Sequence, residues 1–384
     1  MRFTYLLTIV ILIFLIKYSK CVVRKSQFEV NCPTKCQCNQ THFICKNTQK
    51  VGHSMFLAAS PKLYPDLDTL EITGNKIGDL SETSFFDQNN IRHIKVTWVN
   101  ISSNHITGIG HKTLIGFPRV EYFYLADNDI SRVGDAPLEY QKNLKIIDLT
   151  RAISKKLTPK GKADLIRDLF KTEKNEFVDL NKIILNDNGI EFLHPETFCS
   201  VKGLVRLELK NNKLKSFDFD GKNCLSGLEF LDLTNNSIEI ISSHIWEDNE
   251  NLHDLDIAGN PLICSCENKD LLNFASKYAE EFIDSGKTLC HAPSQFAGKS
   301  IFDLKKQDCS HLSSGRIFKF LILLLLSSIF LGAYFTIRTQ KPNLCSKLSF
   351  NIGYTKLRGG HNSRGGCDDD SIPFTRSNNA PVFL

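Results

Sequence analysis

The residues whose chemistry is plainest in this sequence are its cysteines. The chain has 384 residues and 13 cysteines, an odd number that cannot pair completely. Four of them form the pattern Cys-Pro-x-x-Cys-x-Cys-x6-Cys from Cys32 to Cys45, and two more stand in the segment NPLICSC over 260–266. Such spacing suits disulfides in an oxidising compartment, or zinc in a reducing one. Either the cysteines differ in role or the chain crosses between compartments.

Catalytic and nucleic-acid-binding patterns are absent from the sequence. It has no HExxH, no GxSxG and no phosphate-binding glycine loop, and its histidines lack metal-ligand spacing. The net charge is +5, but most of the basic surplus lies from Arg338 onward, so the main body lacks the footprint of a nucleic-acid-binding protein. We expect no enzyme, no cofactor and no nucleic-acid partner.

Two apolar runs indicate how the chain is placed in a membrane. Residues 6–16 read as the core of a signal peptide over 1–21, with an uncleaved anchor as the alternative. Residues 317–337 contain one charge, Lys319, and a helix of that length spans about 30 Å of hydrocarbon. Basic residues follow this run, which predicts a single-pass type I protein of the plasma membrane. The 47 residues after it, 338–384, read as a short disordered cytoplasmic tail.

Between these runs a template, LxxLxLxxNxL, recurs along the chain. Its six matches are 67–77, 120–130, 180–190, 204–214, 228–238 and 252–262. The last four template asparagines, from Asn188 to Asn260, are each 24 residues apart. The template predicts an α/β leucine-rich repeat solenoid, a horseshoe with a parallel concave sheet, in which the asparagine satisfies backbone groups at the turn.

Two further repeats depart from this spacing. With the six matches they bring the expected total over 67–262 to about eight repeats. One has Ala152 in place of the asparagine, and an insertion follows it whose apolar residues have helical spacing, so we expect a longer convex helix there. Near Trp98 two strand registers fit, one over 91–96 and one over 99–101, and the sequence leaves both open.

The cysteine clusters lie at the two ends of the repeats, over 22–66 and 263–310. They resemble the cysteine-rich caps of extracellular leucine-rich repeat proteins, the family that includes the Toll-like receptor, Slit and platelet glycoprotein Ib ectodomains. The resemblance covers residues 32–309. The 47-residue tail is too short for a TIR domain, so we expect none. What it implies is that four disulfides form in the caps, pairing Cys32 with Cys38, Cys36 with Cys45, Cys264 with Cys290, and Cys266 with Cys309.

Two cysteines remain within the repeats. Cys199 and Cys224 follow successive template asparagines by 11 and 12 residues, so neighbouring repeats should bring them together on the convex flank. A disulfide or two buried free thiols fit this placement. Sequons at Asn39, Asn100 and Asn235 are candidate glycosylation sites.

Candidate ligand-binding residues follow from the alternation of the concave strands. The position between the second and third template leucines carries acidic residues in three of the last strands, Glu208, Asp232 and Asp256. Such a row of like charge is unfavourable unless it is solvated or meets a basic ligand, and aspartate is also a common filler at this position. Trp98, Tyr122 and Tyr124 form a candidate aromatic patch, which a glycan at Asn100 could shield in one of the two registers.

In the tail, Cys345 is a candidate for palmitoylation, and the last three residues, Val382-Phe383-Leu384, resemble a ligand for a PDZ-type adaptor. The whole sequence predicts a cell-surface protein that binds an extracellular or membrane protein ligand through its concave face, as a receptor, co-receptor or adhesion molecule. The alternatives are an auxiliary subunit of a channel or receptor complex, and a modulator of Toll-like innate immune signalling that lacks a TIR domain.

Overall fold

The computed structural model describes residues 32–49, 51–52, 54–81, 91–217, 224–247, 249–304 and 310–339. The chain divides into two units, 1–313 and 314–384, each taken here by itself. The expected signal peptide over 1–21, Cys309, Cys345 and the C-terminal PDZ-type sequence all lie outside the described residues.

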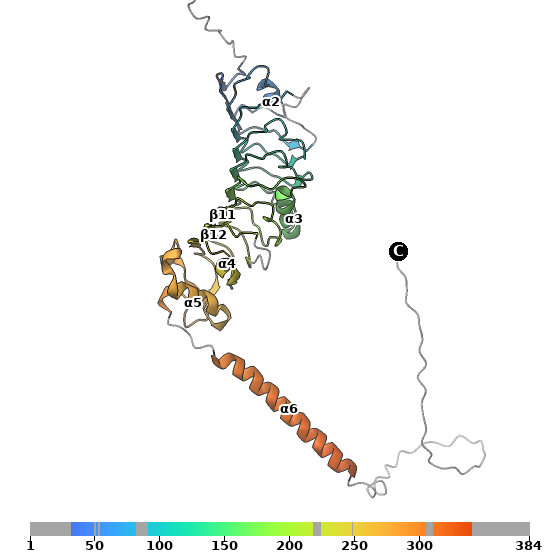
Figure 1. Cartoon of the computed structure of the whole chain (residues 1–384), viewed down its shortest axis with the longest axis vertical. Helices are drawn as coiled ribbons and strands as arrows, with labels where there is room; N and C mark the ends of the chain where they lie inside the picture. Colours follow the sequence, from blue (N-terminus) through green and yellow to red (C-terminus); the bar gives the residue numbers. More distant parts are fainter. Residues whose placement is uncertain are drawn as a thin grey trace, which may run out of the picture. The chain divides into compact units, whose positions relative to one another are not determined.

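One ten-stranded sheet runs through the repeats of the first unit (Figure 1). The first two strands pair antiparallel, and every later pair is parallel. In spatial order the strands are β1 (Cys36–Cys38), β2 (His42–Lys46), β3 (Thr69–Thr73), β5 (Trp98–Asn100), β7 (Tyr122–Tyr124), β9 (Ile146–Asp148), β10 (Lys182–Ile184), β11 (Arg206–Glu208), β12 (Phe230–Asp232) and β13 (Asp254–Asp256). The predicted leucine-rich repeat solenoid with a parallel sheet is thus confirmed.

Smaller elements complete the described fold. A three-stranded parallel sheet joins β4 (Asp79–Leu80), β6 (Gly108–Ile109) and β8 (Arg132–Val133), and a two-stranded sheet joins β14 (Leu262–Ile263) and β15 (Cys290–Ala292). The α-helices are α2 (Ser54–Ala58), α3 (Pro159–Phe170), α4 (His244–Glu247), α5 (Lys269–Lys277) and α6 (Ser310–Thr339). Short 3-10 helices are η2 (Cys266–Asn268), η3 (Ala279–Glu281), η4 (Ser285–Lys287) and η5 (Ile301–Asp303).

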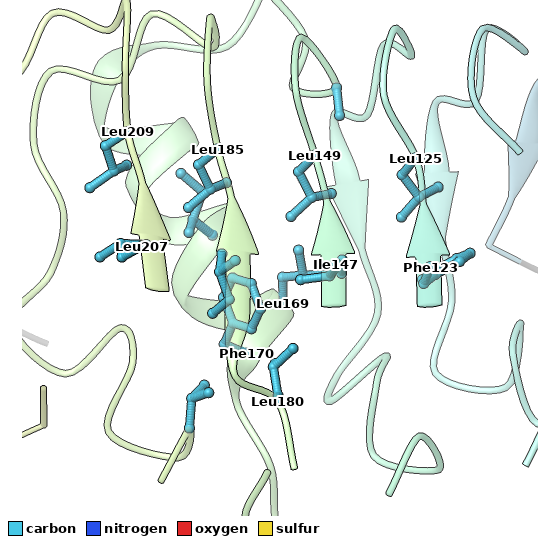
Figure 2. Packing of buried hydrophobic residues seen from close by; sticks show 14 of the residues in the cluster. Phe123, Leu125, Ile147, Leu149, Leu169, Phe170, Leu180, Leu185, Leu207 and Leu209 are labelled. Atoms are coloured by element: carbon cyan, nitrogen blue, oxygen red, sulfur yellow. The ribbon is translucent and has the colours of Figure 1, made fainter. Parts of the chain in front are cut away.

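The core is a column of apolar side chains behind the strands. In each strand of the ten-stranded sheet from β5 onward the middle residue is buried and its two neighbours are partly exposed. Figure 2 shows successive repeats contributing equivalent side chains, such as Leu149, Leu185 and Leu209 directly after three neighbouring strands. This stacking removes from water an apolar surface that no single repeat could cover alone.

A ladder of buried asparagines joins the turns after the strands. Asn212 shows the pattern: its Nδ2 donates to the carbonyls of Leu185 (3.0 Å) and Leu209 (2.8 Å), and its Oδ1 accepts from the backbone N–H groups of Asn188 (3.0 Å) and Ile190 (3.1 Å). Asn104, Asn128, Asn188, Asn236 and Asn260 make equivalent contacts. The asparagine therefore satisfies backbone groups of two adjacent repeats, as the template predicts.

The insertion after Ala152 forms the expected helix, α3. Thr158 caps it by accepting a hydrogen bond from the N–H of Gly161 at 3.1 Å, and Pro159 occupies the first turn, where its missing N–H costs nothing. Leu169 and Phe170 of the helix lie behind the strands in Figure 2 and are buried. The helix therefore supplies core side chains where the chain departs from 24-residue spacing.

The strand register near Trp98 is now determined. β5 comprises Trp98–Asn100 and pairs Trp98 with Thr69 on one side and with Tyr122 on the other. This matches the register that precedes Asn104, and it places Asn100 on the same face as Trp98.

Among the described residues, no helix is both long and apolar enough to cross a membrane. The span expected over 317–337 therefore stays a prediction.

Candidate ligand-binding surface

The concave face presents two rows of outward-pointing residues, one on each side of the buried strand centre. The register of the parallel strands aligns the second row as predicted, and it runs Glu71, Asn100, Tyr124, Asp148, Ile184, Glu208, Asp232 and Asp256. The first row runs Thr69, Trp98, Tyr122, Ile146, Lys182, Arg206, Phe230 and Asp254. The face is therefore a regular array of side chains on rigid, in-register strands.

An aromatic cluster occupies the N-terminal half of this face. The rings of Trp98 and Tyr124 are 5.4 Å apart between centroids, and Tyr122 lies beside Trp98 on the next strand. All three side chains are partly exposed. The structure thus brings together the three aromatic residues that the sequence singled out. They form an amphipathic, conformationally restricted surface of the kind that dominates many protein interfaces.

A hydrogen-bonded ion cluster centred on Glu208 follows. Lys182 Nζ lies 2.8 Å and Arg206 Nε 3.0 Å from one carboxylate oxygen, and Asn186 Nδ2 donates to the other at 3.1 Å. Burial alone would raise the pKa of Glu208, but these donors outweigh it and hold the pKa below its usual range. Glu208 is therefore neutralised within the protein and is not a free member of the predicted acidic row.

The acidic character of the face lies at its C-terminal end instead. Asp232 and Asp256 stand opposite each other on adjacent strands, and each accepts a hydrogen bond from the backbone N–H two residues ahead, at 2.8 and 3.1 Å. Burial, followed by repulsion from Asp232 and Asp284, raises the pKa of Asp256. The two aspartates therefore shape the turns after their strands and place carboxylates side by side on the concave face, and a role for them in ligand binding stays a prediction.

Three outward-facing residues of the first row, Arg206, Phe230 and Asp254, were not identified from the sequence, where the acidic row was traced along the second row. The guanidinium of Arg206 lies 3.3 Å above the ring centroid of Phe230, and Asp254 adds a third carboxylate to the acidic end. The template already contained the signal, since the position before the buried strand centre also points outward.

The cysteines of the caps form the bonds that the family resemblance implies, wherever both partners are described. Cys32 bonds to Cys38, Cys36 to Cys45, and Cys264 to Cys290. Cys266 is also disulfide-bonded, whereas its expected partner lies outside the described residues. Within the repeats, Cys199 bonds to Cys224 across a Cα separation of 4.4 Å, so of the two alternatives the structure has the disulfide. Covalent links thus hold both caps and one flank of the solenoid.

The three candidate glycosylation sites differ in environment. Asn39 is exposed at a turn, where its Oδ1 accepts from the N–H groups of Thr41 and His42. Asn100 is partly exposed within the concave face, and Asn235 is exposed and donates to Asn211 at 2.9 Å. A glycan on Asn100 would cover the aromatic cluster.

Comparison with known proteins points to the same class. Residues 65–130 match the family described as Leucine rich repeat. Human CD180 antigen is 27% identical over 126 residues, which cover 33% of this chain and 19% of CD180. Human Toll-like receptor 3 is 23% identical over 217 residues, which cover 50% and 24%. Chicken keratocan is 27% identical over 224 residues, which cover 58% and 56%. The chain thus matches less than two thirds of the length of each of these relatives.

A solved structure gives the same fold. The crystal structure of human 5T4 (Wnt-activated inhibitory factor 1, trophoblast glycoprotein) superposes with a TM-score of 0.57 at 17% identity, covering 73% of this chain and all of the 5T4 chain. The chain is similar to extracellular leucine-rich repeat proteins with cysteine-rich caps, and these matches indicate a binding protein and not an enzyme.

Proposed function

We propose that this leucine-rich repeat chain is a cell-surface receptor, co-receptor or adhesion protein that binds a protein ligand through its concave face. The observation that carries the proposal is the uneven distribution of side chains on that face. Aromatic rings gather at Trp98, Tyr122 and Tyr124, whereas carboxylates gather at Asp232 and Asp256. A surface used only to close the fold would need neither cluster.

The two clusters suit different parts of one ligand. Partly exposed aromatic rings on rigid strands bury large areas at little entropic cost, so they favour an apolar anchor. The acidic end favours a basic patch, because a cation would relieve the repulsion that raises the pKa of Asp256. The ligand surface we expect is therefore apolar at one end and basic at the other.

We also place the chain in the plasma membrane through residues 317–337, with the repeats outside. The run has a single charge, and the described apolar side chains of α6, such as Leu323 and Phe330, are exposed. The disulfides support an oxidising location for the first unit, since such bonds are rare in the cytosol.

A second candidate function is modulation of Toll-like signalling without a TIR domain. The similarity to CD180 antigen and to Toll-like receptor 3 favours it. Co-expression with human Toll-like receptor 3 distinguishes the two, because a modulator changes the reporter response of that receptor and an unrelated adhesion protein does not.

The main proposal is tested with the full-length chain displayed on cells and fused outside the membrane to a proximity-labelling enzyme. The paired change Asp232→Asn and Asp256→Asn removes two charges but retains the oxygens that accept backbone hydrogen bonds. The change Tyr124→Ala removes an aromatic ring. In both variants, labelling of the same extracellular protein should fall by at least about fivefold, which corresponds to a loss of about 1 kcal/mol in binding free energy.

The matched control is Glu176→Gln, which removes a carboxylate away from the concave strands. This variant should label like the unmodified chain. Unchanged labelling by both concave-face variants would contradict the proposal. Replacing residues 317–384 with a foreign membrane anchor tests the auxiliary-subunit alternative, because an auxiliary subunit should then lose its function whereas an adhesion protein should keep it.

A further inference from the structure

A second surface feature lies away from the concave strands, at the C-terminal cap. A groove of about 600 Å³ opens between helix α4 with the loop after it and helix α5 with its continuation into η3. These elements belong to the last repeat and to the disulfide-bonded cap. The groove is large enough for one or two amino-acid side chains, and its lining determines which kind.

Aromatic rings form one wall of the groove. Trp246 from α4 and Phe274 from α5 stack with centroids 4.4 Å apart and planes at 14°, and Tyr278 packs against Phe274 at 5.1 Å. All three rings are partly exposed. Each therefore contributes to the contact between the repeat and the cap and still presents surface to the groove.

Carboxylates form the rim. Glu247, Glu250, Asp270 and Glu281 all line the groove, and none makes an ion pair with another residue that the structure describes. Burial, followed by repulsion from Glu280, raises the pKa of Glu281. The lining has one cation, Lys277, whose Nζ lies 4.5 Å from the ring centroid of Tyr278. The four carboxylates and the single ammonium group together give the lining of the groove a net formal charge of −3.

An acceptor without a partner adds an independent indication of a ligand. Asn249 lines the groove and is 7% exposed. Its Nδ2 donates to the carbonyl of Ile245 at 2.8 Å, but its Oδ1 has no hydrogen-bond partner among the described residues. A buried oxygen of this kind loses free energy unless a donor reaches it.

We propose that this groove binds arginine or lysine side chains from a basic segment of a partner protein. An aromatic wall attracts a cation through the ring faces, and a guanidinium can stack on an indole while its N–H groups meet carboxylates at its edge. The same N–H groups are donors of the kind that Asn249 Oδ1 lacks within the described part of the chain. Arginine suits the aromatic wall, the carboxylate rim and the Asn249 acceptor together. An anionic or purely apolar ligand would leave the carboxylates without a cation.

This site is separate from the one in the proposed function. It uses α4, α5 and η3, none of which contributes a residue to the concave rows. The two proposals can therefore fail independently.

The test measures fluorescence anisotropy of a labelled octapeptide of alternating glycine and arginine, with the purified full-length chain in detergent. A peptide with citrulline at the arginine positions is the matched neutral probe. The arginine peptide should bind, and its affinity should fall as salt is added. The paired change Glu250→Lys and Glu281→Lys should weaken binding at least tenfold, and Trp246→Leu should weaken it severalfold.

Two controls keep the result specific. Glu176→Lys reverses an exposed charge elsewhere and should bind the arginine peptide as the unmodified chain does. Asp232→Asn with Asp256→Asn removes charge from the concave face and should also leave binding unchanged. Equal binding of the citrulline peptide, unchanged binding by Glu250→Lys with Glu281→Lys, or loss of binding in the concave-face variant would each overturn the proposal. Far-ultraviolet circular dichroism of each variant checks that the fold persists.

Discussion

Replacing Asn212 with alanine should destabilise the solenoid more than its small change in volume suggests. Asn212 is 6% exposed and makes five hydrogen bonds to the backbone of two repeats, the longest of them from Nδ2 to the carbonyl of Lys210 at 3.4 Å. Alanine can make none of them. The five backbone groups are not equally affected, and the ladder determines which of them lose their partners.

The three carbonyls each keep a donor after the change, and that of Lys210 still accepts from the N–H of Asp187 at 3.0 Å. The carbonyl of Leu185 still accepts from Asn188 Nδ2 at 2.9 Å, and that of Leu209 from Asn236 Nδ2 at 3.0 Å. The backbone N–H groups of Asn188 and Ile190 lose the oxygen to which they donate, and both residues are buried. At about 1–3 kcal/mol for each buried donor left unsatisfied, the loss is about 2–6 kcal/mol, a large part of the stability of a typical domain.

Urea unfolding of the full-length chain, followed by the fluorescence of Trp98 and Trp246, measures this loss. Asn251→Ala is the matched control, because Asn251 is exposed and makes a single long bond of 3.3 Å to the carbonyl of Ser226. Its loss should be below about 0.5 kcal/mol.

The reasoning would be refuted if Asn212→Ala lowered the free energy of unfolding by no more than the control does. That result would mean that water or a shifted turn satisfies the two N–H groups. The repeat at Ala152 shows what such a shift requires: there the N–H of Ile130 donates to the carbonyl of Ala152 at 2.8 Å, in the repeat that carries the long insertion.

Three other changes test separate features by the same unfolding assay. Burial lowers the pKa of His93 to about 4, below its unfolded value of about 6.5. The folded state therefore favours the neutral imidazole, and stability that is present above pH 6.5 is lost as the pH falls towards 4. His93→Gln should reduce the dependence of the free energy of unfolding on pH in this range, and an equal dependence in both proteins would contradict the prediction. Burial and repulsion raise the folded pKa of Asp256. Its contribution to stability is therefore present below the unfolded pKa and is lost as the pH rises through the folded pKa. Asp256→Asn should raise the urea midpoint at pH 7 but not at pH 3, and a lower midpoint at pH 7 would show that the charge of Asp256 is needed. Changing Cys199 and Cys224 to serine removes a crosslink with a sequence separation of 25 and should cost about 3 kcal/mol, whereas an unchanged midpoint would show that the bond does not constrain the unfolded chain.

Much of the fold followed from periodicity. The template identified the strands, the buried leucines and the asparagine ladder, and the helical spacing after Ala152 predicted α3. These features depend on neighbours a fixed number of residues apart, so a linear pattern contains them. The first row of the concave face was predictable for the same reason, because strand residues alternate between two faces and the residue before each buried strand centre also points outward.

The candidate surface was less predictable because its electrostatics depend on residues in different repeats. From sequence, Glu208 is one of three acidic residues in successive strands. In the structure, Lys182 from the strand before it and Arg206 from its own strand neutralise it. The acidic end instead consists of Asp232, Asp254 and Asp256, and Asp284 of the cap adds to the repulsion that raises the pKa of Asp256.

The sequence by itself therefore determined the class of fold, the order of its parts and the positions that face outward, because a repeat of nearly constant length defines them through local geometry. Only the tertiary structure decided the register at Trp98, the bond between Cys199 and Cys224, and the groove beside Trp246. Each of these depends on how far an insertion displaces one repeat from the next, or on how the cap docks. Such distances are determined by packing between segments remote in sequence, which a one-dimensional pattern does not record.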